Sequence, residues 1–189
     1  MTDNLAALTA TQLSDLYASG EASPVDVTRA VLDQIETHNP TLNCFCLVDA
    51  DSALATARES EVRWQKGEPL SAIDGIPASI KDLTLTKGWP TMRGSRTSNP
   101  DAPQDEDAPA TARLREAGAV LTGKTTTPEF GWKGVTDNPL TGITRNPWNP
   151  ERTPGGSSGG ASSACASFMG PLHQGSDAAG SIRIPAAFA

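Results

Sequence analysis

Two glycine-rich segments carry serines in a setting suited to nucleophilic chemistry. In the first, Thr153-Pro-Gly-Gly-Ser-Ser-Gly-Gly-Ala161, Ser157 and Ser158 lie between two glycine pairs, and the small residues that follow are typical of a buried helix. A glycine-rich turn entering a helix exposes several backbone N–H groups, which could bind an anion or a developing oxyanion. A flexible Gly/Ser linker is the alternative. Pro154 and the helix that follows favour a fixed turn.

The second segment, Gly175-Ser-Asp-Ala-Ala-Gly-Ser-Ile-Arg-Ile-Pro185, presents Ser181 after a run of small residues. Small side chains before Ser181 would let a substrate carbonyl approach the main chain closely. The alternative is an ordinary turn that leads into a short strand. That alternative explains neither the small residues nor the pair Asp177 and Arg183, which we expect to be buried.

The third candidate is Lys81, which lies inside the otherwise apolar segment Gly75-Ile-Pro-Ala-Ser-Ile-Lys-Asp82. Lysines are rarely fully buried unless they are paired, and a desolvated lysine loses its charge more easily. Lys81 is therefore a candidate general base. The alternative is a lysine that extends from a strand end to the surface, with Asp82 as its partner.

The elements that must position these residues form an α/β pattern. Ser23 and Pro24 predict the start of a capped helix that ends near Asn39-Pro40. Gly131 to Pro154 lacks a periodic pattern and predicts a long ordered connection near a functional surface. The other predicted elements are helices at Thr11 to Ala18, Ser52 to Lys66 and Ala108 to Glu116, strands at Asn43 to Val48, Ile76 to Leu83 and Ala119 to Thr122, and a surface loop at Asn99 to Asp107.

Composition excludes several classes of protein. With 189 residues and 37% hydrophobic content, the chain fits one domain, which we divide into a helical lead-in (about 1–68) and the Lys/Ser segments (about 69–189). A net charge of -7 argues against direct nucleic-acid binding. No apolar run is long enough to span a membrane and no signal peptide is evident, so we expect a cytoplasmic protein. Its three cysteines, Cys44, Cys46 and Cys165, fit reduced, buried thiols.

Taken together, these segments resemble the amidase signature family. The resemblance covers nearly the whole chain and rests on several long motifs in the family's order. They are Gly75-Ile-Pro-Ala-Ser-Ile-Lys-Asp82, Ala117-Gly-Ala-Val-Leu-Thr-Gly-Lys-Thr125, Thr144-Arg-Asn-Pro-Trp148, the Gly-Gly-Ser-Ser-Gly-Gly turn and Gly180-Ser-Ile-Arg-Ile-Pro185. The resemblance implies a mixed β-sheet flanked by helices and an amidase that cleaves carboxamide C–N bonds, with a small-molecule amide as substrate and no metal or organic cofactor.

The resemblance also implies a role for each matched residue. Ser181 would be the nucleophile, Lys81 the base, and Ser157 the serine between them, preceded by a cis peptide bond. A neutral lysine acting through Ser157 would activate Ser181 without any histidine. Backbone N–H groups from Ala178 to Ser181 would form the oxyanion hole, and the region of Phe130 and Gly131 would line the acyl pocket. The remaining implied residues are Ala179 and Gly180 in the oxyanion hole, and Ser158, Asp177 and Arg183 as supports of the loops.

The two histidines enter only as weaker candidates. His38 lies at a predicted helix end, which favours a surface or dipole role. His173 lies eight residues before Ser181 and is retained as an alternative proton carrier.

The chain departs from the family pattern in two places. Ala179 stands where the family commonly has glycine, and a positive φ at that position would cost roughly 1 to 2 kcal/mol with alanine. The chain also ends at Ala189, just beyond the nucleophile motif, whereas family members continue much further. We therefore expect an N-terminal portion of an amidase domain, with exposed apolar surface and a tendency to aggregate on its own.

Three other interpretations stay open. One is the glutaminase-type component of a tRNA-dependent amidotransferase, against which Ile184 argues because that component tends to carry glutamine there. Another is a non-catalytic remnant. The third is a phosphate loop, since Gly118 to Thr125 formally fits Gly-x4-Gly-Lys-Thr, although strand-like residues fill the loop position and Pro128 follows. The substrate and the oligomeric state, a homo-oligomer included, are left undetermined.

Overall fold

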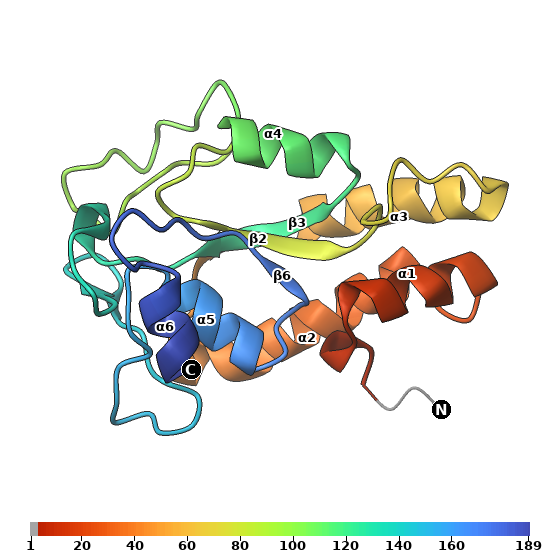
Figure 1. Cartoon of the computed structure of the whole chain (residues 1–189). Coiled ribbons are helices and arrows are strands. Elements are labelled where there is room, and N and C mark those ends of the chain that lie inside the picture. Colours follow the sequence, from red (N-terminus) through yellow and green to blue (C-terminus); the bar gives the residue numbers. More distant parts are fainter. Residues whose placement is uncertain (1–3) are drawn as a thin grey trace.

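The computed structural model describes residues 4–189 and contains a four-stranded mixed sheet flanked by helices (Figure 1). The strand order is β1-β3-β2-β6, in which β1 is antiparallel to β3, and β2 is parallel to both β3 and β6. This confirms the predicted fold class. The strands of this sheet are β1 (Phe45–Val48), β2 (Pro77–Lys81), β3 (Val120–Thr125) and β6 (Leu172–His173), and a separate small ribbon pairs β4 (Asp137–Asn138) with β5 (Gly142–Ile143).

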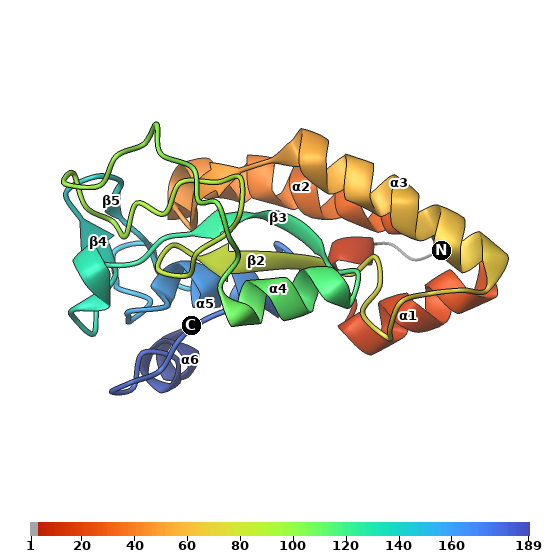
Figure 2. The same ribbon diagram turned by 90° about the horizontal axis from the view of Figure 1, so that it is seen from above.

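Helices cover both faces of the sheet. In Figure 1, α4 lies above the sheet, whereas α2 and α5 lie below it, and Figure 2 shows α2 and α3 side by side along one flank. The main apolar cluster packs α2 and α5 against β1. The helices are η1 (Leu5–Ala7), α1 (Ala10–Ser19), α2 (Pro24–Leu42), α3 (Ala50–Lys66), α4 (Pro109–Glu116), η2 (Glu129–Gly131), α5 (Gly159–Ala166) and α6 (Arg183–Phe188).

The predicted start of α2 is confirmed by its capping box. Ser23 accepts from the N–H of Asp26, and the Asp26 side chain accepts from the N–H of Ser23. The predicted end near Pro40 is wrong, because α2 continues to Leu42. Pro40 lies in the last turn and removes only one backbone donor there, while Leu42 is buried in the main cluster.

The strand β2 sends alternate side chains to opposite faces of the sheet. Ala78 and Ile80 join the apolar cluster that includes Leu114 of α4. Lys81 therefore projects toward the opposite face, where α5 begins at the serine-bearing turn. The sheet thus delivers Lys81 to the side on which the predicted site lies.

The segment between residues 131 and 154 is an ordered connection, as predicted. Its β4–β5 ribbon is closed by a hydrogen bond from Thr144 N to Thr136 O at 2.9 Å. Two large apolar side chains in it are conspicuously exposed, Trp132 at 91% and Trp148 at 77%. They match the expected exposed apolar surface, while aggregation of the chain stays a prediction.

The chain after Ser181 forms the helix α6 and no strand. Backbone N–H groups of Ile182 and Arg183 donate to the Asp177 carboxylate, which therefore caps the start of α6. Pro185 sits in the first turn of α6, where a missing N–H is tolerated. The turn-to-strand interpretation of this segment is therefore wrong.

One part of the cysteine prediction is also wrong. All three thiols are free, but only Cys44 is buried, Cys46 is half-buried and Cys165 is exposed. Cys165 lies on the outer side of α5, beside a cavity that the turn around Leu172 leaves partly open. No helix among residues 4–189 combines the length and apolar character that crossing a membrane requires.

Candidate active site

The first two predicted residues are in direct contact. Lys81 Nζ donates a hydrogen bond to Ser157 Oγ at 2.7 Å, and the Lys81 side chain is completely buried. Burial lowers the pKa of Lys81 to about 8, and the negative charge of Asp177 opposes that shift only in part. A fraction of Lys81 is therefore neutral near pH 7, which is the form that can accept a proton. Asp82 is not its partner, so the strand-end interpretation of Lys81 is wrong.

The turn that carries Ser157 is held tightly against other parts of the chain. A Cβ atom at Gly156 would lie 2.7 Å from the carbonyl carbon of Val135, and one at Gly160 would lie 2.5 Å from Thr126 N. Thr136 Oγ1 ties the turn together, because it donates to Gly155 O at 2.8 Å and accepts from Gly159 N at 3.1 Å. The Gly156–Ser157 peptide bond is cis, as the resemblance implies. The segment is a fixed turn and not a flexible linker.

Ser181 lies in the neighbouring loop and is half-buried. Its carbonyl oxygen accepts a hydrogen bond from Ser158 N at 3.0 Å, so the two serine-bearing segments are joined through their backbones. Ser158 Oγ reaches the backbone of Ser176 at 3.4 Å. Within residues 4–189, the Ser181 hydroxyl itself makes no hydrogen bond to a protein atom.

Asp177 organises the loop around Ser181. Its carboxylate accepts two hydrogen bonds from the Arg183 guanidinium at 3.0 Å and one from Gly180 N at 2.6 Å. The Arg183 guanidinium, together with these backbone donors, lowers the pKa of Asp177 far below its usual range. The expectation that this pair is buried is wrong, since the side chain of Arg183 is 77% exposed. The pair stabilises the loop from its outer surface.

The backbone donors predicted for an oxyanion hole differ in availability. The N–H of Gly180 is occupied by Asp177. In the described part of the chain, the N–H groups of Ala178, Ala179 and Ser181 donate to no protein acceptor. Ala179 has no positive φ, whereas Gly180 does at 102°. Alanine at position 179 is therefore accommodated without the backbone strain considered from the sequence.

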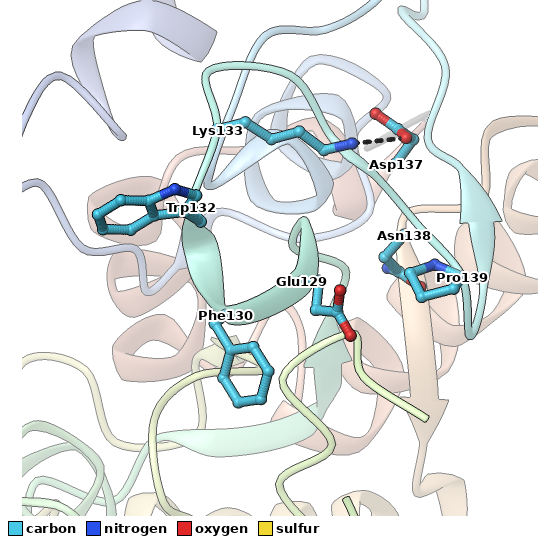
Figure 3. Close-up of a pocket in the computed structure, with 7 residues that line it drawn as sticks. All are labelled: Glu129, Phe130, Trp132, Lys133, Asp137, Asn138 and Pro139. Carbon is cyan, nitrogen blue, oxygen red and sulfur yellow. Dashed lines mark hydrogen bonds and ion pairs between the residues drawn. The ribbon is translucent and has the colours of Figure 1, made fainter. Parts of the chain in front are cut away.

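Gly131 lies beside the Lys81–Ser157 pair. A Cβ at this position would be 3.4 Å from Ser157 Oγ and 2.7 Å from Leu83 Cδ1. Phe130 precedes it in a left-handed conformation, with φ 51° and ψ 18°. Figure 3 shows the turn over these residues and the adjoining cavity of about 790 Å³, which Glu129, Phe130, Trp132, Lys133, Asp137, Asn138 and Pro139 line.

The sequence reasoning missed two residues that contact Lys81. Ser176 Oγ accepts a hydrogen bond from Lys81 Nζ at 3.1 Å, and Gln174 Oε1 accepts one from the Lys81 backbone N–H at 3.1 Å. Both follow β6, whose pairing with β2 brings them to the end of β2. The available signal was their place directly before Asp177 in the second glycine-rich segment.

His173 has a structural environment. Its Nδ1 accepts from Ser79 Oγ at 2.7 Å and its Nε2 donates to Gly170 O at 2.9 Å, an arrangement of a neutral imidazole. Burial lowers the pKa of His173 from 6.5 to about 4. It pairs β6 with β2 two residues before Lys81, with no hydrogen bond to either serine of the site.

This environment predicts a loss of stability in acid. The unfolded chain binds a proton at His173 near pH 6.5, whereas the folded chain does so only near pH 4, so the folded state is penalised as the pH falls through that window. The expected loss is at most about 3 kcal/mol, since one pKa unit corresponds to about 1.4 kcal/mol. Urea unfolding of the wild type and of His173→Gln at both ends of the window should show a smaller loss in the variant. An equal loss in both would assign the effect to carboxylates elsewhere.

The second lysine considered from the sequence is also explained by structure. Lys124 lies inside β3 and is buried, with Nζ 3.2 Å from Asp82 Oδ1 and 2.7 Å from Thr91 Oγ1. No helix begins after it; the chain continues through Pro128 into η2. The geometry of a phosphate loop is absent at this position, and the nucleotide-binding interpretation is wrong.

Comparison with known proteins supports one family. The model of the amidase family matches residues 26–189. Among curated proteins, the chain is 44% identical over 179 residues to the GatA-type component of the glutamyl-tRNA(Gln) amidotransferase of Acidothermus cellulolyticus, covering 95% of this chain and 35% of that protein. The corresponding protein of Mycobacterium bovis is 46% identical over 188 residues, covering 99% of this chain and 38% of that protein. The chain thus spans little more than a third of the length of these relatives.

Solved structures agree in fold. A fatty acid amide hydrolase superposes with a TM-score of 0.92 at 30% identity, covering 99% of this chain and 33% of that one. A bacterial aryl acylamidase of the amidase signature family superposes with a TM-score of 0.90 at 35% identity, covering 95% of this chain and 37% of that one. The sheet and the helices that carry Lys81, Ser157 and Ser181 are therefore similar to those of both structures.

Proposed function

The chain belongs to the amidase family, and from that premise we propose that Lys81, Ser157 and Ser181 hydrolyse carboxamide C–N bonds through an acyl-enzyme. One observation supports the proposal above others, the 2.7 Å contact between the fully buried Lys81 Nζ and Ser157 Oγ. A serine hydroxyl is a weak nucleophile until a base takes its proton, and a buried lysine with a pKa of about 8 is such a base.

In the proposed reaction, Ser181 Oγ attacks the amide carbonyl carbon. Its proton passes to Ser157 Oγ while the Ser157 proton passes to the neutral amine of Lys81. The C=O π bond becomes an oxyanion, toward which the free N–H groups of Ala178, Ala179 and Ser181 are the available donors. Lys81 then returns a proton through Ser157 to the leaving nitrogen, and water hydrolyses the resulting ester by the same route.

The supporting residues have separate parts in this proposal. Ser158 and Asp177 hold the loop of Ser181, and Arg183 neutralises Asp177 from the solvent side. Gly131 leaves space beside Ser157 for the acyl group of a small-molecule amide. The reaction as proposed requires neither a metal nor an organic cofactor, and we place it in the cytoplasm, as the composition predicts.

The experiment that tests this function is ammonia release from primary carboxamides, acetamide, benzamide and L-glutamine among them. The full-length protein should release ammonia, and hydroxylamine should divert the acyl group to a hydroxamate because an acyl-enzyme is intercepted before water reacts. Ser181→Ala should reduce both signals to background. Ammonia release that persists in Ser181→Ala would contradict the proposal.

A second candidate function is favoured by the curated relatives, which are components of glutamyl-tRNA(Gln) amidotransferases. In that function, glutamine would be the only amide hydrolysed, and hydrolysis would depend on partner proteins. Ile184 no longer argues strongly against it, because its side chain packs against the glycines at 155 and 180, which makes it a packing residue. Hydrolysis of benzamide without any partner would favour the free-standing amidase, whereas turnover of glutamine alone, and only with partners, would favour the amidotransferase component. Failure of both would support the non-catalytic remnant.

A further inference from the structure

We propose that Ser176 is a positioning residue that directs the lone pair of Lys81 toward Ser157, an inference that rests on the proposed function. Lys81 Nζ has two hydroxyl partners, Ser157 Oγ at 2.7 Å and Ser176 Oγ at 3.1 Å. In the described part of the chain these are its only hydrogen-bond partners. Ser176 is thus the second of the two groups that orient the reacting nitrogen.

The chemistry of an amine explains why a second partner matters. A neutral lysine has two N–H donors and one lone pair, and it rotates freely about its terminal C–N bond. Its lone pair must face Ser157 to receive the proton. When one N–H stays on Ser176 Oγ, that rotation is restricted, and the lone pair is left free to face Ser157. Ser176 itself gains and loses no proton in the reaction.

The backbone fixes Ser176 in the required place. Gln174 N donates to Ser79 O at 2.8 Å, and Gln174 Oε1 accepts from the backbone N–H of Lys81 at 3.1 Å. These bonds extend the pairing of β6 with β2 past the last residue of β6. On the other side, the backbone of Ser176 contacts Ser158 Oγ at 3.4 Å. The hydroxyl is therefore placed by both segments that form the site.

The same geometry predicts how Ser176 influences the titration of Lys81. A hydroxyl oxygen accepts a stronger hydrogen bond from an ammonium than from an amine. Ser176 therefore favours the charged form and opposes the effect of burial. Its removal should lower the pKa of Lys81, whereas a merely loosened structure would admit water and return that pKa upward toward 10.5.

The test is the pH dependence of fluorophosphonate labelling in the full-length protein, which depends on serine activation and needs no knowledge of the substrate. In the wild type, the labelling rate should rise with pH around a midpoint of about 8. In Ser176→Ala, we expect the plateau rate to fall about tenfold and the midpoint to move down by about half a unit. Ser176→Thr keeps the hydroxyl and should restore both to within about twofold.

A matched control is Ser162→Ala, which removes a serine hydroxyl that bonds only to Gly159 O within α5. Its rate and midpoint should equal those of the wild type. An unchanged plateau or an upward midpoint in Ser176→Ala, with a labelled wild type, would overturn this inference alone. An adduct on Ser176 itself would overturn it as well, by making that residue a nucleophile. A wild type that is not labelled at all would contradict the proposed function and this inference together.

Discussion

Replacing Lys81 with alanine should lower the rate of fluorophosphonate labelling at Ser181 by about a thousandfold, the largest effect on activity expected of any substitution outside the nucleophile. The reason is that Lys81 supplies, among residues 4–189, the only buried amine in contact with Ser157, at 2.7 Å. Without it, the proton of Ser181 has no acceptor beyond water. The rate should also lose its dependence on pH near 8, because the group that titrates there is gone.

Two further variants make the Lys81 result interpretable. Lys81→Met fills most of the same volume without an amine, so it separates loss of the base from a cavity at the end of β2. Lys87→Ala removes one positive charge from an exposed position and should leave the rate unchanged. Wild-type labelling in a folded Lys81→Met protein at neutral pH would make the lysine-base mechanism wrong.

The largest effect on stability is expected at Gly160, which should cost about 3 kcal/mol when replaced by alanine. Its Cβ would lie 2.5 Å from Thr126 N and 2.6 Å from Cys44 O, which are backbone atoms at the ends of β3 and β1. Backbone atoms cannot move aside as a flexible side chain would. The first turn of α5 would therefore shift away from the sheet and carry Ser157 with it, so labelling should fall together with stability.

Gly134→Ala is the matched control for this substitution. Neither glycine has a positive φ, and a Cβ at Gly134 would meet only Ile184 Cδ1 at 3.5 Å, an ordinary contact. We expect its free energy of unfolding in urea to stay within about 0.5 kcal/mol of the wild type. Equal stability of the two variants would show that the serine-bearing turn is less tightly packed than described.

Several parts of the site could be predicted from the sequence because their signals are local. Lys81 is a lone charge in an apolar strand, and burial of that strand determines the environment of Lys81. The capped start of α2 at Ser23 depends on neighbouring residues alone. The two glycine pairs around Ser157 indicated close backbone approach, which the distances at Gly156 and Gly160 confirm.

Other parts depend on contacts between segments far apart in the chain, and these were missed. Ser176 reaches Lys81 only because β6 pairs with β2, a register that no local pattern reveals. Arg183 was expected to be buried, but its partner Asp177 caps α6 at the surface. Pro40 suggested a helix end, yet the burial of Leu42 extends α2 beyond it. In each case, tertiary packing outweighed the local signal.

Activation of Ser181 through Ser157 and Lys81 is the central claim. The most direct test is to locate the fluorophosphonate adduct by fragmentation of the peptide that contains Ser157, Ser158, Ser176 and Ser181. We expect a single adduct on Ser181, at a rate that increases with pH around about 8 and collapses in Lys81→Met. An adduct on another serine, or one on Ser181 that forms at an undiminished rate without Lys81, would contradict the claim.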